Sequence, residues 1–88
     1  MDNLWYVYIL RCRDDTLYCG ITPDLDKRIQ LHNCGKGAKY TRGRGPVELM
    51  YAEQLQSRSD ASKREAAIKR LSRSEKLELI AQYKTAAE

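Results

Sequence analysis

Arg28 and His32 are residues whose types and spacing could together do chemistry. They lie four residues apart in a helix-like segment, so they share one helix face, beside an apolar stripe formed by Leu25 and Ile29. A guanidinium can hold a phosphate, and an imidazole can hydrogen-bond or shuttle a proton. The alternative interpretation is a solvated arginine beside a histidine that caps or packs near the helix end.

Glu65 is a carboxylate at an inward-facing helix position. Ala61, Glu65, Ile68 and Leu71 follow the spacing of a buried stripe, where a carboxylate is costly unless it is paired or binds a cation. An internal salt bridge, for example to Arg28, would explain it. A single carboxylate could also anchor Mg²⁺, which keeps most of its waters and binds through one or two carboxylates plus substrate phosphate. No cluster of acids accompanies Glu65 in the sequence, which argues against a two-metal site.

Three of the six tyrosines lie in one short segment of a chain that has no phenylalanine. Tyr6 and Tyr8 are two residues apart in a strand-like run, so they share a face, and Tyr18 in the next strand can meet them. Gly20 lies on the same face as Tyr18, and we expect it to leave an open patch there. Phenols that fill a core with their hydroxyls at its rim are the simpler interpretation. The alternative is a hollow in which one phenol orients or deprotonates a water beside a phosphodiester.

Positive charge is concentrated in one part of the 88-residue chain. The net charge is only +4, but residues 27–45 hold six basic residues and no acid, whereas residues 1–26 hold two arginines and five aspartates. Such a basic block favours a polyanionic partner, because phosphate neutralisation and counterion release depend on local charge.

Within this block, Gly35 to Pro46 reads as a long glycine-rich loop. Its mixture of cations and a tyrosine suits phosphate contacts and base or sugar stacking, although a solvated loop is the simpler interpretation. Without an accessory recognition domain, we expect a nucleic-acid target to be recognised by its shape, nicks, branches or single strands and not by a long specific sequence. The candidate nucleic-acid-binding residues are Lys36, Lys39, Tyr40, Arg42 and Arg44.

The cysteines and the N-terminus bear on the compartment. Cys12, Cys19 and Cys34 are odd in number and lack the close pairing of structural zinc sites, so they predict neither a disulfide framework nor a zinc ribbon. The apolar run Leu4 to Leu10 is too short for a signal peptide or a membrane span. We therefore expect a soluble, cytoplasmic protein with one domain over residues 1–88.

The first elements that must position these side chains are two strands and a helix. Leu4 to Arg11 predicts a strand buried on both faces, and Thr16 to Thr22 a second strand, antiparallel to it across a short turn. The segment Thr22-Pro23-Asp24 predicts a helix start, with Thr22 as the cap and proline at the first helical position. This helix should run to about Asn33, with Gly35 or Gly37 ending it.

The second half of the chain predicts one strand and two helices. Val47 to Leu55 has strand character, and Ser57 or Ser59 can cap a helix that runs through Leu71. A capping box at residues 72–75 starts a last helix, with Leu77, Ile80 and Ala81 on one face. The order β-β-α-β-α-α predicts an α+β domain with helices flanking a small, mostly antiparallel three-stranded sheet.

Together these residues resemble a known family. Tyr6-Val7-Tyr8, then Tyr18-Cys19-Gly20, and then Arg28, His32 and Glu65 in order resemble the GIY-YIG nuclease domain. The resemblance covers about residues 4–83 and is strongest for small single-domain bacterial members, which are uncharacterised proteins. Matching stretches are WYVYIL, LYCGIT, GKGAKYTRGRGPV and EAAIKRLSRSEK. The resemblance implies a three-stranded antiparallel sheet with flanking helices, and DNA phosphodiester hydrolysis with a single divalent ion, Mg²⁺ or Mn²⁺.

The resemblance also implies roles for the matching positions. Tyr8 and Tyr18 would be active-site phenols, one of them helping to activate water. Arg28 would bind and neutralise the scissile phosphate, His32 would assist proton transfer or water orientation, and Glu65 would hold the metal ion. A phenol is a poor base at neutral pH unless cations lower its pKa, which Arg28 and a metal ion could do.

The chain departs from the family pattern at three points. Tyr6 replaces the glycine of the first triplet, Cys19 replaces the middle residue of the second, and no asparagine follows Asn33. We predict that Tyr6 is structural. The sequence thus predicts a divalent-metal-dependent DNA endonuclease, structure-selective or weakly sequence-selective, in DNA repair or recombination. The alternatives are a non-catalytic nucleic-acid-binding module and a protein-interaction unit of a repair assembly, acting with a protein partner or as a homodimer.

Overall fold

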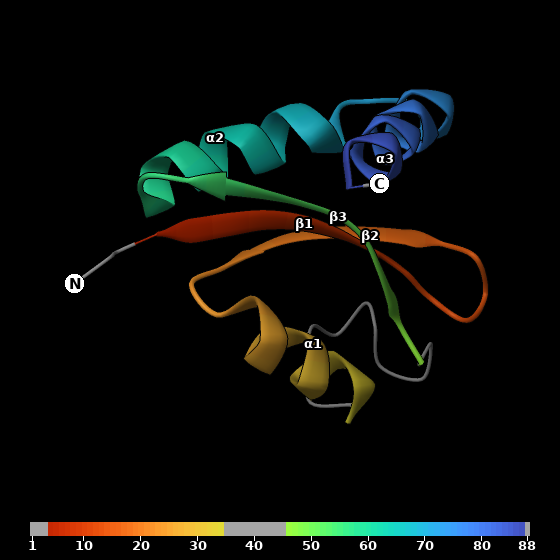
Figure 1. Ribbon diagram of the computed structural model, residues 1–88, viewed down its shortest axis with the longest axis horizontal. Helices are drawn as coiled ribbons and strands as arrows, with labels where there is room; N and C mark the ends of the chain where they lie inside the picture. Colours follow the sequence, from red (N-terminus) through yellow and green to blue (C-terminus); the bar gives the residue numbers. More distant parts are fainter. Residues whose placement is uncertain (1–3, 35–45, 88) are drawn as a thin grey trace.

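The structure is a computed structural model in which residues 4–34 and 46–87 are described. It confirms the predicted α+β architecture and the order β-β-α-β-α-α (Figure 1). The elements, in chain order, are β1 (Trp5–Arg11), β2 (Leu17–Thr22), α1 (Leu25–Asn33), β3 (Glu48–Leu55), α2 (Arg58–Lys69) and α3 (Arg73–Ala87).

The three strands form one antiparallel sheet in the order β2-β1-β3. The central strand β1 is covered on both faces, so four consecutive residues, from Val7 to Leu10, are buried. This explains why β1 reads as a continuous apolar run and not as an alternation of apolar and polar residues. In the register of the hairpin, Tyr8 lies opposite Gly20 and Leu10 lies opposite Tyr18.

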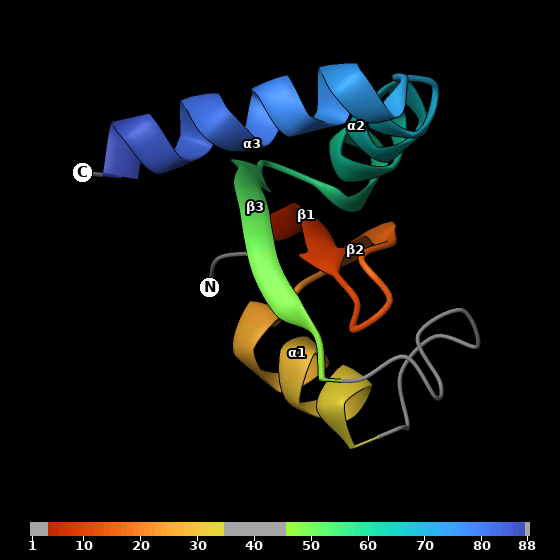
Figure 2. The ribbon, with the colours of Figure 1, turned by 90° about the vertical axis from the view of Figure 1, so that its right-hand side faces the viewer.

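The helices form two layers, one on each side of the sheet. Helices α2 and α3 cover one face, and α1 lies against the other (Figures 1 and 2). Alternate residues of β1 divide between these layers: Val7 and Ile9 belong to the core under α2 and α3, whereas Tyr8 and Leu10 belong to the core under α1. None of the helices among the described residues has the length and apolar character needed to cross a membrane.

The start of α1 differs from the prediction. Its N-cap is Asp24, whose carboxylate accepts a hydrogen bond from the Lys27 backbone N–H at 3.2 Å, so the helix begins at Leu25 and Pro23 precedes it. Thr22 is instead the last residue of β2, and its hydroxyl accepts from the Asp24 N–H at 3.1 Å. Pairing with β1 holds Thr22 in the strand, which leaves the next capable residue to cap the helix. The helix ends at Asn33 as predicted, and Gly35 and Gly37 lie outside the described residues.

The caps of the last two helices follow the predicted chemistry. Ser57, and not Ser59, caps α2 by accepting from the Asp60 N–H at 3.1 Å. The capping box is formed: the Ser72 hydroxyl accepts from the Glu75 N–H at 3.1 Å, and the Glu75 carboxylate accepts from the Ser72 N–H at 2.9 Å. These hydrogen bonds with Ser72 hold the pKa of Glu75 below its usual value.

One predicted bound of these helices is wrong: α2 ends at Lys69, so it does not run through Leu71. Leu77, Ile80 and Ala81 share one face of α3, but only Ile80 is buried, since Leu77 is 45% exposed and Ala81 is exposed. Leu79 and Tyr83 pack beside Ile80 against the core.

Candidate active site

Two phenols and the imidazole meet on the α1 side of the sheet. The Tyr8 hydroxyl lies 3.1 Å from His32 Nε2, and both side chains are 1% exposed. The half-buried Tyr18 ring completes a triangle, with ring centroids 6.3 Å from Tyr8 and 5.4 Å from His32. Strand β1, strand β2 and helix α1 thus each supply one ring to a single aromatic cluster.

Gly20 has a different role from the open patch that the sequence suggested. A Cβ atom at this position would lie 2.6 Å from Tyr8 Oη, 2.9 Å from Tyr8 Cζ and 3.1 Å from Tyr18 Cε2. The Tyr8 ring therefore crosses directly over Gly20 and occupies the space that a side chain would take. The prediction of a gap is wrong, because glycine is needed here so that the phenol can lie across the strand and reach His32.

Arg28 adds a positive charge to this cluster. Its half-buried guanidinium is within hydrogen-bonding reach of the Tyr8 hydroxyl. Among residues 4–34 and 46–87, no carboxylate lies within ion-pair distance of it. Arg28 is thus partly desolvated, and no carboxylate in this part of the chain neutralises it, so its guanidinium is suited to binding an anion.

The environment holds both members of the Tyr8–His32 pair in their neutral forms. Burial raises the pKa of the Tyr8 phenol, against the lowering effect of the hydrogen bond from Arg28. Burial and the charge of Arg28 both lower the pKa of His32. A neutral imidazole nitrogen can accept, so we assign the hydrogen bond as Tyr8 Oη donating to His32 Nε2. The phenol is then the donor and the imidazole the acceptor of this pair, with the Arg28 charge beside them.

The lowered pKa of His32 makes fold stability depend on pH. Below the ordinary value of 6.5, the unfolded chain takes up a proton more readily than the folded chain, so this contribution is lost as the pH falls from about 6.5 through the folded pKa. We expect the free energy of unfolding in urea to decrease between pH 7 and pH 5. In His32→Gln this part of the decrease should vanish. An equal decrease in both proteins would contradict the assignment.

Glu65 lies in the other layer, on α2. Ala61 and Ile68 of the predicted stripe are fully buried, whereas the Glu65 side chain is 23% exposed and its carboxylate pairs with Lys69 at 3.4 Å. The suggested salt bridge to Arg28 is therefore wrong. The pKa of the Cys19 thiol on β2 is raised to about 11, first by burial and next by the negative charge of Glu65. The carboxylate of Glu65 is therefore close enough to β2 to act on this thiol. Glu65 thus stands near the edge strand β2, across the sheet from Arg28.

A polar contact that the sequence analysis missed fixes the rotation of α2. Arg64 Nε donates to Glu53 Oε1 on β3 at 2.8 Å, and the Tyr51 hydroxyl donates to the same oxygen at 3.2 Å. Neighbouring side chains on a helix point about 100° apart. Because the Arg64 side chain is bound to Glu53 on β3, the side chain of Glu65 projects away from β3, on the side of β2. The only signal in the sequence was the charge alternation of these residues, which is too common to be specific.

The side chain of Asn33 makes a second contact that the sequence did not reveal. Its side-chain oxygen accepts from the Val47 backbone N–H at 2.7 Å, which ties the end of α1 to the residue before β3. Because His32 is the preceding residue, this contact helps to hold the imidazole against Tyr8.

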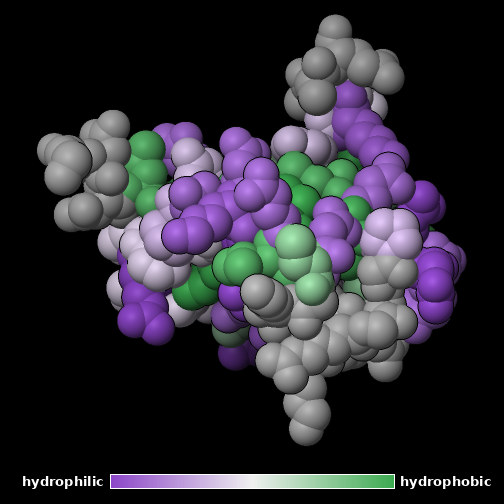
Figure 3. Space-filling model, turned by 90° about the horizontal axis from the view of Figure 1, so that it is seen from below, coloured by the Kyte–Doolittle hydropathy of each residue, from purple (hydrophilic) through white to green (hydrophobic). Residues whose placement is uncertain are grey.

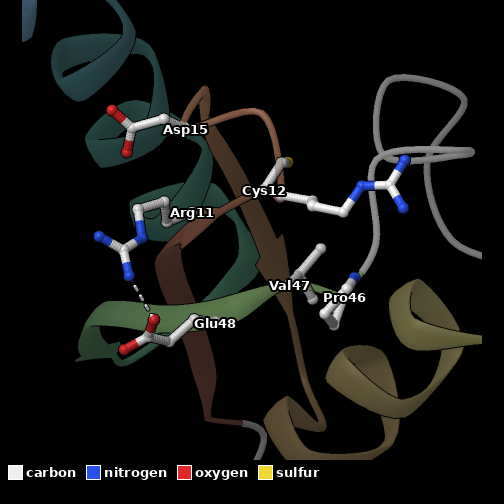
Figure 4. A pocket seen from close by; sticks show the side chains of 7 residues that line it. Arg11, Cys12, Asp15, Pro46, Val47 and Glu48 are labelled. Atoms are coloured by element: carbon white, nitrogen blue, oxygen red, sulfur yellow. Dashed lines mark hydrogen bonds and ion pairs between the residues drawn. The ribbon is translucent and has the colours of Figure 1, made fainter.

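The surface outside the aromatic cluster combines polar and apolar side chains. On the α1 side, polar side chains gather across the face with apolar ones between them (Figure 3). A pocket of about 280 Å³ near the β1–β2 turn is separate from the aromatic cluster, and its Arg11 guanidinium is already paired with Glu48 at 2.8 Å (Figure 4).

The predicted nucleic-acid-binding residues Lys36, Lys39, Tyr40, Arg42 and Arg44 lie outside the described residues and stay predictions.

Comparisons with known proteins identify the family of this chain. Residues 4–78 match the family model described as the GIY-YIG catalytic domain. A UPF0213 protein of Oceanobacillus iheyensis is 56% identical over 80 residues, which cover 91% of this chain and 93% of the relative. A UPF0213 protein of Clostridium perfringens is 57% identical over 75 residues, which cover 85% of this chain and 81% of the relative.

Solved structures show the same fold. The solution NMR structure of a UPF0213 protein from Bacillus halodurans is 47% identical, with a TM-score of 0.59 over 90% of this chain and 84% of that one. The solution NMR structure of a protein from E. faecalis is 38% identical, with a TM-score of 0.63 over 97% of this chain and 93% of that one. The chain therefore belongs to the GIY-YIG family, and its close homologues are the small UPF0213 proteins.

Proposed function

We propose that this chain is a divalent-metal-dependent DNA endonuclease that hydrolyses phosphodiester bonds. Membership of the GIY-YIG family supports a nuclease-type function. The observation that carries the proposal for this chain is the buried hydrogen bond between Tyr8 and His32 at 3.1 Å. Beside it lies Arg28, which lowers the pKa of Tyr8 and has no carboxylate within ion-pair distance among the residues that the structure describes. The proposal takes residues 1–88 as one catalytic domain.

In this mechanism Arg28 binds a non-bridging oxygen of the scissile phosphate. A water oxygen attacks phosphorus, the bond from phosphorus to the leaving sugar oxygen breaks, and that oxygen takes a proton from solvent water. The water proton passes to Tyr8 Oη while the phenolic proton passes to His32 Nε2, which lies 3.1 Å away. Burial raises the pKa of Tyr8, so the phenol is protonated at neutral pH and cannot by itself accept the water proton. The neutral imidazole of His32 therefore supplies the basicity, and Arg28 stabilises the charge that develops. The half-buried Tyr18 orients the water.

Glu65 is the residue that would hold the metal ion. The described residues contain no group of three His, Cys, Asp or Glu side chains that could enclose an ion. One partly exposed carboxylate nevertheless fits an ion that keeps several waters and takes its other ligand from the substrate phosphate, as Mg²⁺ does. When bound, the ion supplies charge neutralisation at the phosphate oxygens. The exposed ion pair with Lys69 is a weak competitor, since such pairs contribute about 0–1 kcal/mol.

The proposed substrate follows from the position of these groups. Arg28 from α1 lines one pocket with Thr22, the last residue of β2, and the charge of Glu65 from α2 acts on the Cys19 thiol of the same edge strand. A phosphodiester held by both groups would therefore lie across that edge. A flexible or distorted strand can follow such an edge more easily than a regular duplex. We therefore propose branched, nicked or single-stranded DNA as the substrate, in repair or recombination. The free thiols of Cys12, Cys19 and Cys34 support a cytoplasmic setting.

The proposal is tested by incubating the purified protein with flapped, branched and single-stranded DNA in Mg²⁺ or Mn²⁺. We expect cleavage of at least one of these substrates and complete loss of cleavage in EDTA. Salt-sensitive binding without cleavage would overturn the enzymatic proposal in favour of a binding module. Absence of both would favour a protein-interaction unit.

A further inference from the structure

A pocket of about 310 Å³ opens beside Arg28, where β2 passes into α1. Its size lies at the lower end of the range of about 300–1,000 Å³ that ligand pockets occupy, which suits one small unit of a longer molecule. It is lined by Thr22, Pro23, Asp24, Lys27, Arg28 and Leu31.

The polar groups that line this pocket differ in whether they already have a partner within the protein. The Asp24 carboxylate accepts from the Lys27 backbone N–H, and the Thr22 hydroxyl is hydrogen-bonded to the backbone of Asp24, so both have partners within the protein. The Lys27 ammonium is exposed and has no carboxylate within ion-pair distance among the residues that the structure describes. The chemistry that the pocket offers to a ligand is therefore mainly cationic.

The pocket also has apolar walls. Pro23 and the half-buried Leu31 add carbon surface to the same lining as the two cations. A ligand that fits this combination carries an anionic group for the ammonium and an apolar or planar body for the walls. A nucleotide has both parts.

We propose that this pocket holds the nucleotide next to the scissile phosphate, with Lys27 binding the phosphate on the far side of that nucleotide. The inference rests on the proposed function, because it takes Arg28 as the ligand of the scissile phosphate. Lys27 and Arg28 are consecutive on α1, so their side chains diverge by about 100° from neighbouring backbone positions. They can thus contact consecutive phosphates of one strand with the pocket between them.

The test is a scan of one branched DNA in which each phosphate of one strand is replaced in turn by an uncharged methylphosphonate. Binding is measured in EDTA, so that no cleavage interferes, for wild type, Arg28→Gln, Lys27→Gln and Lys63→Gln. Lys63 is an exposed lysine on α2 and serves as the matched control. In wild type, each substitution at a contacted phosphate should weaken binding.

We expect Arg28→Gln to become insensitive to substitution at one phosphate and Lys27→Gln to become insensitive at the phosphate directly next to it. Lys27→Gln should also lower the slope of log Kd against log salt by about one unit, whereas Lys27→Arg should restore it. Lys63→Gln should keep the wild-type pattern at both positions.

The inference is overturned if Lys27→Gln keeps the wild-type pattern, or if its insensitive phosphate is not adjacent to that of Arg28. Failure of the proposed function is a separate result: it shows as absence of Mg²⁺-dependent cleavage of the unmodified DNA. The scan is read from binding alone, so the two failures can be told apart.

Discussion

Gly20→Ala should lower the rate of DNA cleavage by roughly 100-fold while the chain still folds, because the new methyl group collides with Tyr8. The Cβ would lie 2.6 Å from the phenolic oxygen of Tyr8, a ring that is only 1% exposed. The ring must shift and lengthen its 3.1 Å contact with His32, and a displacement of about 1 Å in a catalytic group can cost about 100-fold in rate. Overpacking of this kind should also destabilise the fold by about 1–3 kcal/mol.

The double variant Gly20→Ala with Tyr8→Phe separates packing from chemistry. Loss of the phenolic oxygen removes the closest of the clashing atoms, so urea unfolding should show part of the lost stability restored. Cleavage under single-turnover conditions should stay at the level of Tyr8→Phe alone, because the hydroxyl is absent from both. A Gly20→Ala protein that cleaves at the wild-type rate would show that the position of the Tyr8 ring is not important for the reaction.

Arg28→Gln should lower the cleavage rate by roughly 10²–10³-fold with little change in stability. Removing one preorganised donor to a developing anion commonly costs about this much. No carboxylate among the described residues is left without its cation by this change, so the fold should tolerate it. The Tyr8 pKa should rise further, since the hydrogen bond and charge that lower it are lost.

The matched control for Arg28 is Arg58→Gln, which removes the same charge from the opposite layer. Arg58 lies at the start of α2 with its guanidinium 5.6 Å from the centre of the Trp5 ring, away from the aromatic cluster. Arg28→Lys should recover only part of the rate, because an ammonium lacks the planar fork of donors. A rate for Arg28→Gln equal to that of Arg58→Gln would show that Arg28 acts only through net charge.

The sequence predicted those parts of the site that depend on local periodicity. Residues two apart on a strand and four apart on a helix must share a face, so Tyr6 could be grouped with Tyr8, and Arg28 with His32, before their layers were known. The family resemblance, and not the periodicity, joined these two groups into one site. Pairing of β1 with β2 then brought Tyr18 to the same face. The family resemblance was confirmed by the comparisons over residues 4–78.

Other parts depended on tertiary packing and could not be read from the sequence. The path of the Tyr8 ring across Gly20 follows from a side-chain rotamer that the crowded α1 layer selects. The side on which Glu65 projects follows from the tie between Arg64 and Glu53, and its ion pair with Lys69 is a local contact that competes with distant partners. The choice of Asp24 over Thr22 as helix cap depended on where β2 stops pairing.

The most direct test of the proposed reaction is the single-turnover cleavage of one branched DNA in Mg²⁺ by wild type and by Glu65→Gln, with Glu78→Gln on α3 as the matched control. We predict that wild type and Glu78→Gln cleave at similar rates and that Glu65→Gln is slower by roughly 10²–10⁴-fold, since metal-ion stabilisation is worth several kcal/mol. Equal rates for wild type and Glu65→Gln, or no cleavage by wild type, would contradict the assignment of this chain as a metal-dependent DNA endonuclease.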